Sequence, residues 1–235
     1  KQLIDFKAEA DVLIDKKGLK KDEAIFNVLR EYIKTSKAIL FEGNGYGEEW
    51  QKEAKKRGLS NNKNTPEALK VKIAPKTVAL YESLEVMNKT EIEARYEIEV
   101  EDYINRIQIE GRVLGDVARN HIIPTAVKYQ NILINNVRGL KDIYGNDFKK
   151  YASEQLVLIK DISNYIESIN SGVTAMINER KKANVISESH KKAETYCNKV
   201  KPLFDEIRYN CDKLELLIDD ELWPLPKYRE LLFTR

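Results

Sequence analysis

The chain has 235 residues, with 40 basic and 38 acidic side chains and a formal net charge of +2. This near balance gives no general attraction to nucleic acid or to an anionic membrane, so neither is an expected partner. Hydrophobic residues make up 42% of the chain, enough for a sizeable core, while only 10 Gly and 6 Pro permit long helices. No apolar run approaches the roughly 20 residues of a membrane-spanning helix.

The cellular compartment is predicted from the cysteines and the first residues. Cys197 and Cys211 are the only cysteines. On one straight helix they would lie about 21 Å apart, too far for a disulfide, which fits a reducing compartment. The first residues mix charged and apolar side chains, unlike a secretory signal peptide, so we expect a cytoplasmic protein. The chain begins at Lys1 rather than Met, which suggests a piece of a larger protein.

The first half of the chain predicts several short helices. Apolar residues from Leu3 to Leu13 predict a helix that stops near Gly18, and three-and-four spacing predicts a second helix from Asp22. A short amphipathic helix is expected from about Glu48 to Arg57, with Gly58 as a natural C-terminal stop.

Further helix starts follow at Thr and Pro residues. Thr65 is the expected cap of a helix with Pro66 in its first turn, and another short helix should run from Pro75 to about Leu84. Thr90 is the expected cap of a long helix. Pro124 should kink or interrupt that helix near residues 121–123.

The second half predicts three long helices with heptad-like spacing of apolar residues. Their predicted buried positions are Ile92, Tyr96, Val100, Tyr103, Ile107, Gly111, Leu114 and Ala118, then Phe148, Ala152, Leu156, Ile159, Ile162, Ile166, Ile169, Val173 and Met176, and finally Ala193, Tyr196, Val200, Leu203, Ile207, Cys211, Leu214 and Ile218. Pro202 should kink the last of the three. Helices joined by short turns pack antiparallel, so we expect an up-down-up bundle.

The predicted fold is therefore all-α. It consists of a long antiparallel helical bundle with several shorter N-terminal helices and an extended Pro-containing C-terminal tail. Residues 1–87 should form the short helices and a Gly-containing turn that packs on the bundle, residues 88–218 the bundle, and residues 219–235 the tail. The three parts are expected to form one structural unit.

The glycine-rich segment from Gly43 to Gly47 invites a phosphate-binding interpretation. That chemistry needs free backbone N–H groups at a helix N-terminus. Here Glu48 and Glu49 occupy the first turn and would repel a phosphate, and the spacing matches neither common nucleotide-binding fingerprint. A turn that requires positive φ is the favoured interpretation.

No other constellation predicts a catalytic, cofactor-binding or metal-binding residue. Glu93, Glu97 and Glu101 lie at four-residue spacing and read as a solvated helix face. The two histidines are His121 and His190, and neither has an acidic residue three positions before it, as a di-iron bundle needs. His121 has apolar neighbours, so a buried, hydrogen-bonded histidine is expected there.

Three stretches resemble one known family. They are the segment from Phe41 to Leu59, with its Gly turn and Trp50; the segment from Glu93 to Tyr129; and the tail Leu222-Trp223-Pro224-Leu225-Pro226-Lys227-Tyr228-Arg229-Glu230-Leu231-Leu232-Phe233. Together they resemble the C-terminal region of type III glutamine synthetases, in the family's order and over nearly the whole chain.

The resemblance implies an accessory, oligomerisation-related role in an ATP-dependent glutamate–ammonia ligase, without catalysis by this chain alone. ATP and Mg are expected only in the upstream catalytic domain, so no cofactor is expected here. The implied partners are that domain of the same polypeptide and further copies in a homo-oligomer. Tyr46, Trp50 and Trp223 are the candidate contacts with a domain or subunit, although Trp50 could equally fill the local core.

Two alternatives belong to other functional classes. One is a free-standing helical scaffold or protein-interaction domain. The other is a small helical enzyme that acts on an anionic metabolite at Arg95, Arg106 or Arg112. An enclosed pocket lined by these arginines would favour the enzyme.

Overall fold

A computed structural model describes residues 1–233 of the chain, and the predicted tail residues 234–235 lie outside this range. The described part contains no strand, which confirms the all-α class. Its α-helices are α1 (Gln2–Lys17), α2 (Lys21–Ser36), α3 (Glu48–Lys56), α4 (Thr65–Lys70), α5 (Pro75–Ser83), α6 (Lys89–Val117), α7 (Ile123–Tyr144), α8 (Phe148–Tyr151), α9 (Ser153–Asn184), α10 (Ser189–Thr195), α11 (Pro202–Leu217) and α12 (Tyr228–Leu231). Short 3-10 turns are η1 (Lys37–Ile39), η2 (Val71–Ile73) and η4 (Gly145–Asp147).

Contacts divide the chain into two compact units, whereas the sequence predicts one. Unit 1 comprises Lys1–Lys63 and Pro75–Lys89, and unit 2 comprises Asn64–Ala74 and the chain from Thr90 onward. The segment 64–74 belongs with the long helices because Pro66 is fully buried and Lys72 forms an ion pair with Glu99 of α6. The sequence places this segment with the N-terminal helices instead.

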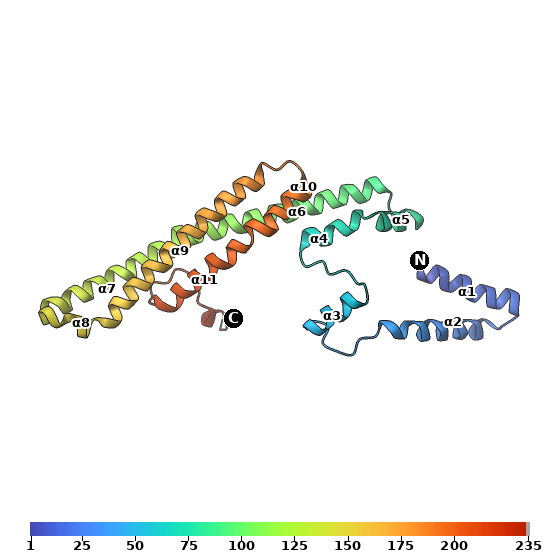
Figure 1. Ribbon diagram of the computed structural model, residues 1–235, viewed down its shortest axis with the longest axis horizontal. Coiled ribbons are helices and arrows are strands. Elements are labelled where there is room, and N and C mark those ends of the chain that lie inside the picture. Colours follow the sequence, from blue (N-terminus) through green and yellow to red (C-terminus); the bar gives the residue numbers. More distant parts are fainter. Residues whose placement is uncertain (234–235) are drawn as a thin grey trace. The chain divides into compact units, whose positions relative to one another are not determined.

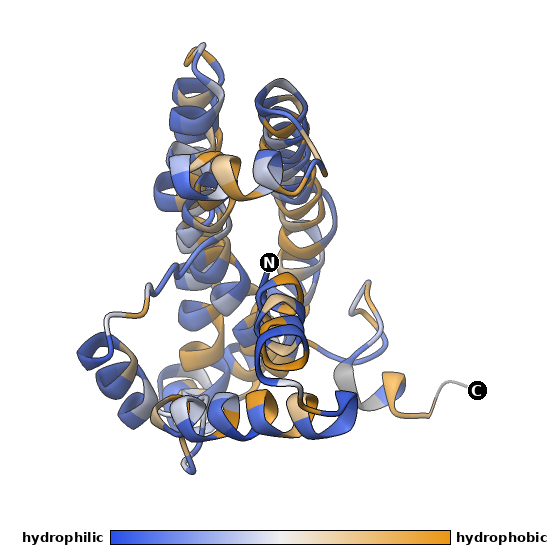
Figure 2. Cartoon of the chain, turned by 90° about the vertical axis from the view of Figure 1, so that its right-hand side faces the viewer, coloured by the Kyte–Doolittle hydropathy of each residue, from blue (hydrophilic) through white to orange (hydrophobic). Residues whose placement is uncertain are grey.

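Unit 2 is built from three long helical stretches. Figure 1 shows that the chain reverses direction after α7 and again after α9. The middle stretch, α9, contacts both α7 and α11. Along these helices, hydrophobic and hydrophilic residues alternate in the manner of amphipathic helices (Figure 2).

Two prolines lie just after π turns. A proline has no N–H, and its ring crowds the carbonyl four residues earlier. Before Pro124 the chain forms η3 (Ala118–Ile122), where the Ile123 N–H bonds to the Ala118 carbonyl five residues back. Before Pro202 it forms η5 (Tyr196–Val200), where the Lys201 N–H bonds to the Tyr196 carbonyl at 2.9 Å. The expected interruptions are therefore widened turns through which the helices continue.

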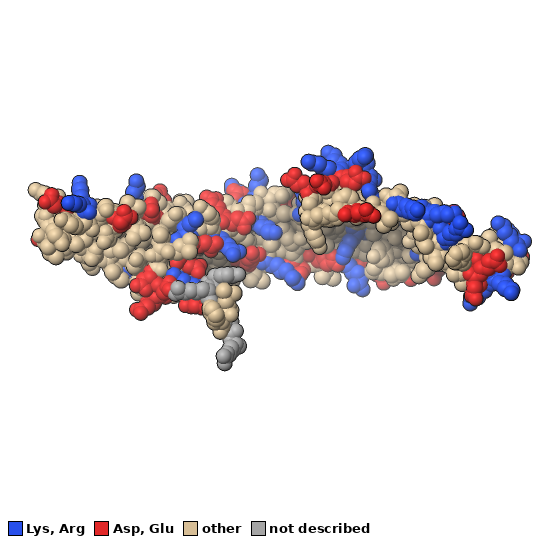
Figure 3. All heavy atoms as spheres, turned by 90° about the horizontal axis from the view of Figure 1, so that it is seen from below, with Lys and Arg blue, Asp and Glu red and all other residues tan. Residues whose placement is uncertain are grey.

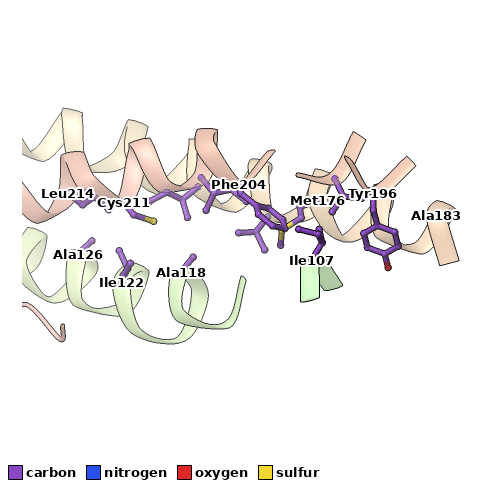
Figure 4. Packing of buried hydrophobic residues seen from close by; sticks show 14 of the residues in the cluster. Ile107, Ala118, Ile122, Ala126, Met176, Ala183, Tyr196, Phe204, Cys211 and Leu214 are labelled. Carbon is purple, nitrogen blue, oxygen red and sulfur yellow. The ribbon is translucent and has the colours of Figure 1, made fainter. Parts of the chain in front are cut away.

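The core of unit 2 lies between these stretches. Figure 4 shows Cys211 and Leu214 of α11 directed toward Ile122 and Ala126. At Gly172 of α9 the helices approach so closely that an added Cβ would lie 3.0 Å from Cγ1 of Ile207. Most of the predicted buried positions are confirmed. The exceptions are Leu156, which is exposed, and six half-buried residues: Tyr103, Leu114, Phe148, Ile159, Ile166 and Leu203. Ile104 and Gly115, which were not predicted, are buried.

Two predicted helix caps are wrong. The cap of α4 is Asn64, whose Oδ1 accepts the Glu67 N–H at 3.0 Å, and Thr65 is the first helical residue. Thr90 is already inside α6. The stops at Gly18 and Gly58 are confirmed, with φ of 67° and 75° in the left-handed region that glycine tolerates. Glycine at the position after a helix end allows the terminal carbonyls to be bonded, as Leu59 N–H does to Ala54.

The tail is tied to the end of α11 and ends in the short helix α12, so it is not extended throughout. The ammonium of Lys227 donates to the carbonyls of Glu215 and Ile218, at 2.8 and 3.2 Å, and also contacts Asp220. A cation at these carbonyls satisfies acceptors that a helix C-terminus leaves unpaired. Trp223 is buried in the core of unit 2.

Cys197 and Cys211 are both free thiols, as predicted. Burial raises the pKa of Cys211 from 9.0 to about 11, and Asp212 adds a smaller upward shift. The raised pKa means that the folded state favours the thiol. Its contribution to stability is complete below pH 9 and is lost as the pH rises toward 11.

We therefore expect alkaline conditions to weaken unit 2 partly through Cys211. Between neutral pH and about pH 10, the free energy of unfolding should fall by roughly 1 kcal/mol more in the native protein than in Cys211→Ala. Urea denaturation at the two pH values measures this difference. Equal losses in the two proteins would show that Cys211 ionises as freely in the folded state as in the unfolded state.

Candidate interaction surface

The helix α2 carries apolar side chains on two faces. Ala24 and Val28 are buried, and α2 contacts α1 through the edge-to-face pair Phe6 and Tyr32, with ring centroids 5.6 Å apart. A second stripe at helical spacing is exposed to solvent: Phe26 (62%), Leu29 (47%) and Ile33 (57%). A surface helix with one neighbour normally has one apolar face, so the second stripe is available to another partner.

The exposed stripe continues beyond the end of α2. Ile39 and Leu40 in and after η1 are exposed to 74% and 65%. We refer to Phe26, Leu29, Ile33, Ile39 and Leu40 together as the α2 surface. Clustered exposed apolar side chains mark interaction sites more often than isolated ones do.

The glycine turn after this surface is held by local contacts around Trp50. The rings of Phe41 and Trp50 lie 4.7 Å apart between centroids, and the Arg57 guanidinium lies 5.9 Å from the Trp50 ring. Arg57 also donates to the carbonyls of Ala38 and Leu40, at 3.0 and 3.1 Å. Trp50 is half-buried by these contacts, so much of its surface is used within unit 1.

The turn does not have the conformation expected from its glycines. None of Gly43, Gly45 and Gly47 has a positive φ, so that prediction is wrong. Glycine at position 43 is needed for space, because an added Cβ would lie 2.5 Å from the Phe41 ring. Glu48 and Glu49 occupy the first turn of α3, where the sequence predicts them and where their negative charges would repel a phosphate.

The three predicted contact residues lie in different environments. Tyr46 is 98% exposed at the tip of the turn, where its backbone N–H bonds to Asn44 Oδ1 at 3.0 Å. Trp50 is half-buried, and Trp223 lies in the core of unit 2. Of the three, Tyr46 is therefore the most exposed, Trp50 keeps part of its surface exposed, and Trp223 packs in the core of unit 2.

Unit 1 has an unusual balance of buried and exposed apolar residues. Its buried apolar residues are five, three of them alanines: Ala10, Ala24, Val28, Ala54 and Val78. Its exposed large apolar residues are twelve: Leu3, Ile4, Val12, Phe26, Leu29, Ile33, Ile39, Leu40, Tyr46, Leu59, Leu80 and Val86. A unit with so small a core gains little stability from its own packing.

The burial of the two histidines differs from the prediction. His121 is exposed, so its predicted burial is wrong. His190 is the shielded one: its Nδ1 lies 2.8 Å from the Tyr96 hydroxyl and its Nε2 lies 3.1 Å from Glu194. Burial, with the nearby charges of Glu97, Glu188 and Glu194, raises the pKa of Tyr96. No sequence signal points to this pair, because its members are far apart in the chain and meet only in the folded bundle.

The carboxylates and arginines considered for chemistry lie mostly on the surface. Glu93, Glu97 and Glu101 are all exposed, as are Arg95 and Arg106. Within residues 1–233, no group of three His, Cys, Asp or Glu side chains is arranged to hold a metal ion. None of the helices in this range is long and apolar enough to cross a membrane.

A protein-family model described as the glutamine synthetase C-terminal domain matches residues 24–141, half of the chain. The chain belongs to the glutamine synthetase C-terminal domain family. The matched region begins in α2 and ends in α7, so it contains the α2 surface, Tyr46 and Trp50.

Relatives of this glutamine synthetase C-terminal domain agree with the match. A glutamine synthetase of Bacteroides fragilis is 45% identical over all 235 residues, and one of Butyrivibrio fibrisolvens is 30% identical over 90% of the chain. A type-3 glutamine synthetase of Dictyostelium discoideum is 28% identical over 96% of the chain. These findings confirm the resemblance recognised in the sequence. The chain spans 32%, 30% and 31% of the three relatives.

Proposed function

We propose that this chain is the C-terminal accessory region of a type III glutamine synthetase and does not catalyse the reaction by itself. In this proposal, the region binds the catalytic part of the same polypeptide and helps to assemble a cytoplasmic homo-oligomer. The observation that carries the proposal is the apolar surface of unit 1, where twelve large apolar side chains are exposed and five apolar residues are buried.

Elementary energetics supports a covered surface. Burying a Leu, Ile or Phe side chain stabilises by roughly 1.5–3 kcal/mol. Binding of a partner that covers the five side chains of the α2 surface would therefore be favoured by several kcal/mol. Tyr46 adds an aromatic ring with a polar end, a side chain that is enriched in interfaces.

The proposal assigns the glutamate–ammonia ligase reaction, with ATP and Mg, to the rest of the polypeptide. Support for this assignment is that the chain spans about a third of relatives named glutamine synthetase. The residues that bind ATP and Mg would then lie in the part of the polypeptide outside this chain.

The proposal is tested by comparing the complete polypeptide with a version that lacks these 235 residues. We expect this chain alone to show no ATP-dependent glutamine synthesis, and the shortened polypeptide to lose its assembled mass in native mass spectrometry. Full activity of the shortened polypeptide, with the same number of subunits in its assembly, would contradict an accessory role and favour a free-standing scaffold.

Two aromatic substitutions should separate local packing from docking. Trp50→Ala removes the contact with Phe41 and should destabilise unit 1 by about 1–2 kcal/mol, because the ring is half-buried. Tyr46→Ala should change stability by less than about 0.5 kcal/mol, because the ring is exposed, yet weaken assembly of the complete enzyme. Urea denaturation of the chain and native mass spectrometry of the enzyme measure the two effects. Intact assembly in Tyr46→Ala would remove Tyr46 from the interface.

A further inference from the structure

Unit 2 contains a hollow of about 250 Å³ between α6, η3 and α9. Its floor is apolar and includes Val173, Met176 and Ile177 of α9. Three arginines line it: Arg112 from α6, Arg119 from η3 and Arg180 from α9. Basic and acidic side chains both occur along the visible face of the chain (Figure 3), and at this hollow three guanidinium groups meet one carboxylate, that of Asp116.

One of the three guanidinium groups is held in place. Arg119 donates from Nη2 to Thr174 Oγ1 at 2.7 Å and to the Asn170 carbonyl at 3.3 Å, and from Nε to Asn170 Oδ1 at 3.2 Å. These acceptors are neutral, so the positive charge of Arg119 is not compensated by them. The group is thereby oriented at the rim without being neutralised.

The other two guanidinium groups have no anionic partner. Among the side chains that the structure describes, none forms a hydrogen bond or ion pair with Arg112 or Arg180. Arg112 of α6 and Arg180 of α9 therefore line the hollow from two different helices, beside its apolar residues.

The rim carries a net positive charge. Asp116 lies on it and accepts a hydrogen bond from Asn120, but one carboxylate faces three guanidinium groups, so the hollow favours an anion. The apolar residues of the lining favour an anion that has an aliphatic part over inorganic phosphate. Arginine binds a carboxylate through two parallel N–H bonds.

We propose that this hollow binds a small organic carboxylate, with its acidic group on Arg112 and Arg180 and its aliphatic part on the half-buried Ile177, next to the buried Met176. This inference goes beyond the proposed function and does not depend on it.

The two methionines of the chain provide the measurement. Met176 lies in the hollow, and Met87 lies in unit 1 and serves as an internal control. In a chain with isotope-labelled methionine methyl groups, butyrate should shift the Met176 signal saturably and leave Met87 unchanged. We expect a dissociation constant on the order of 1 mM, typical of a small ligand held by a charge-assisted contact.

Two further ligands test the chemistry at constant ionic strength. Butanol has the aliphatic part without the charge, and inorganic phosphate has charge without the aliphatic part. Both should bind at least about tenfold more weakly than butyrate, since each loses one of the two kinds of contact. Equal binding of butanol would overturn the role of the arginines, and equal binding of phosphate would overturn the role of the apolar floor.

Arginine substitutions locate the site. Arg112→Gln and Arg180→Gln should each weaken butyrate binding roughly tenfold, the expected loss of one hydrogen-bonded charge. Arg106→Gln is the matched control, because Arg106 lies on the same helix with its side chain 77% exposed and does not line the hollow. Unliganded Met176 signals at the native position show that each variant is folded. A shift that survives both Gln variants, or no saturable shift in the native chain, would overturn the site.

Discussion

Replacing Ile207 with alanine should lower the free energy of unfolding of unit 2 by about 3 kcal/mol. Ile207 is fully buried on α11 and packs against Gly172 of α9. The substitution removes the buried methyl and methylene groups and leaves a cavity between the two helices, which pack too closely to collapse further. Leu216→Ala on the same helix is the matched control, because Leu216 is 77% exposed and should change stability by less than about 0.5 kcal/mol.

A double substitution tests the physical reason. Gly172→Ala alone places a Cβ 3.0 Å from Ile207 Cγ1, so we expect a loss of about 1 kcal/mol from overpacking despite the better helix propensity of alanine. In the Ile207→Ala background the same Cβ fills part of the cavity, so Gly172→Ala should become neutral or stabilising. Additive effects of the two changes would contradict direct packing between these positions.

Fluorescence can follow the two units separately, because each contains one tryptophan. Trp50 lies in unit 1 and Trp223 in the core of unit 2. In a Trp50→Phe background, urea denaturation followed by Trp223 fluorescence reports on unit 2. The Ile207 substitutions should shift this transition, and an unchanged Trp223 transition would contradict the placement of Ile207 in the core of unit 2.

Replacing Phe26 and Ile33 together with aspartate should disrupt assembly of the complete enzyme while leaving this chain folded. Both side chains are exposed on the outer stripe of α2, so the isolated chain should lose less than about 1 kcal/mol of stability. Two carboxylates in a covered apolar interface would lose their hydration without partners, which costs several kcal/mol. Native mass spectrometry of the enzyme should therefore show dissociated subunits.

The control for this prediction uses two exposed isoleucines of α6. Ile98 and Ile109 are exposed to 65% and 61%, similar to Phe26 and Ile33, but lie outside the α2 surface. Their replacement by aspartate should leave the assembly intact. If both pairs of substitutions disrupt assembly equally, the effect is general charge repulsion. If neither does, the α2 surface is not an interface of the enzyme, and packing on the bundle of the same chain becomes the alternative to test.

Much of the fold could be predicted because local rules act within a few residues. Apolar spacing determined the long helices of unit 2 and most of their buried stripes, such as Ile162, Ile169 and Ile207. Glycine at positions 18 and 58 determined two helix ends, because left-handed backbone is favourable only without a Cβ. The resemblance carried by the Gly turn and the tail determined the family. These signals need no knowledge of which segments meet.

The tertiary structure decided what depends on neighbours that are distant in the chain. The sequence predicted the same role, a contact with another domain or subunit, for Tyr46, Trp50 and Trp223. In the structure, Phe41 packs against Trp50, the core of unit 2 buries Trp223, and Tyr46 stays exposed. The sequence also could not show that His190 meets Tyr96, or that Arg112, Arg119 and Arg180 surround one hollow. Helical periodicity tells which side of a helix is apolar, but only packing decides whether that side is covered, and α2 shows an apolar side that unit 1 by itself leaves exposed.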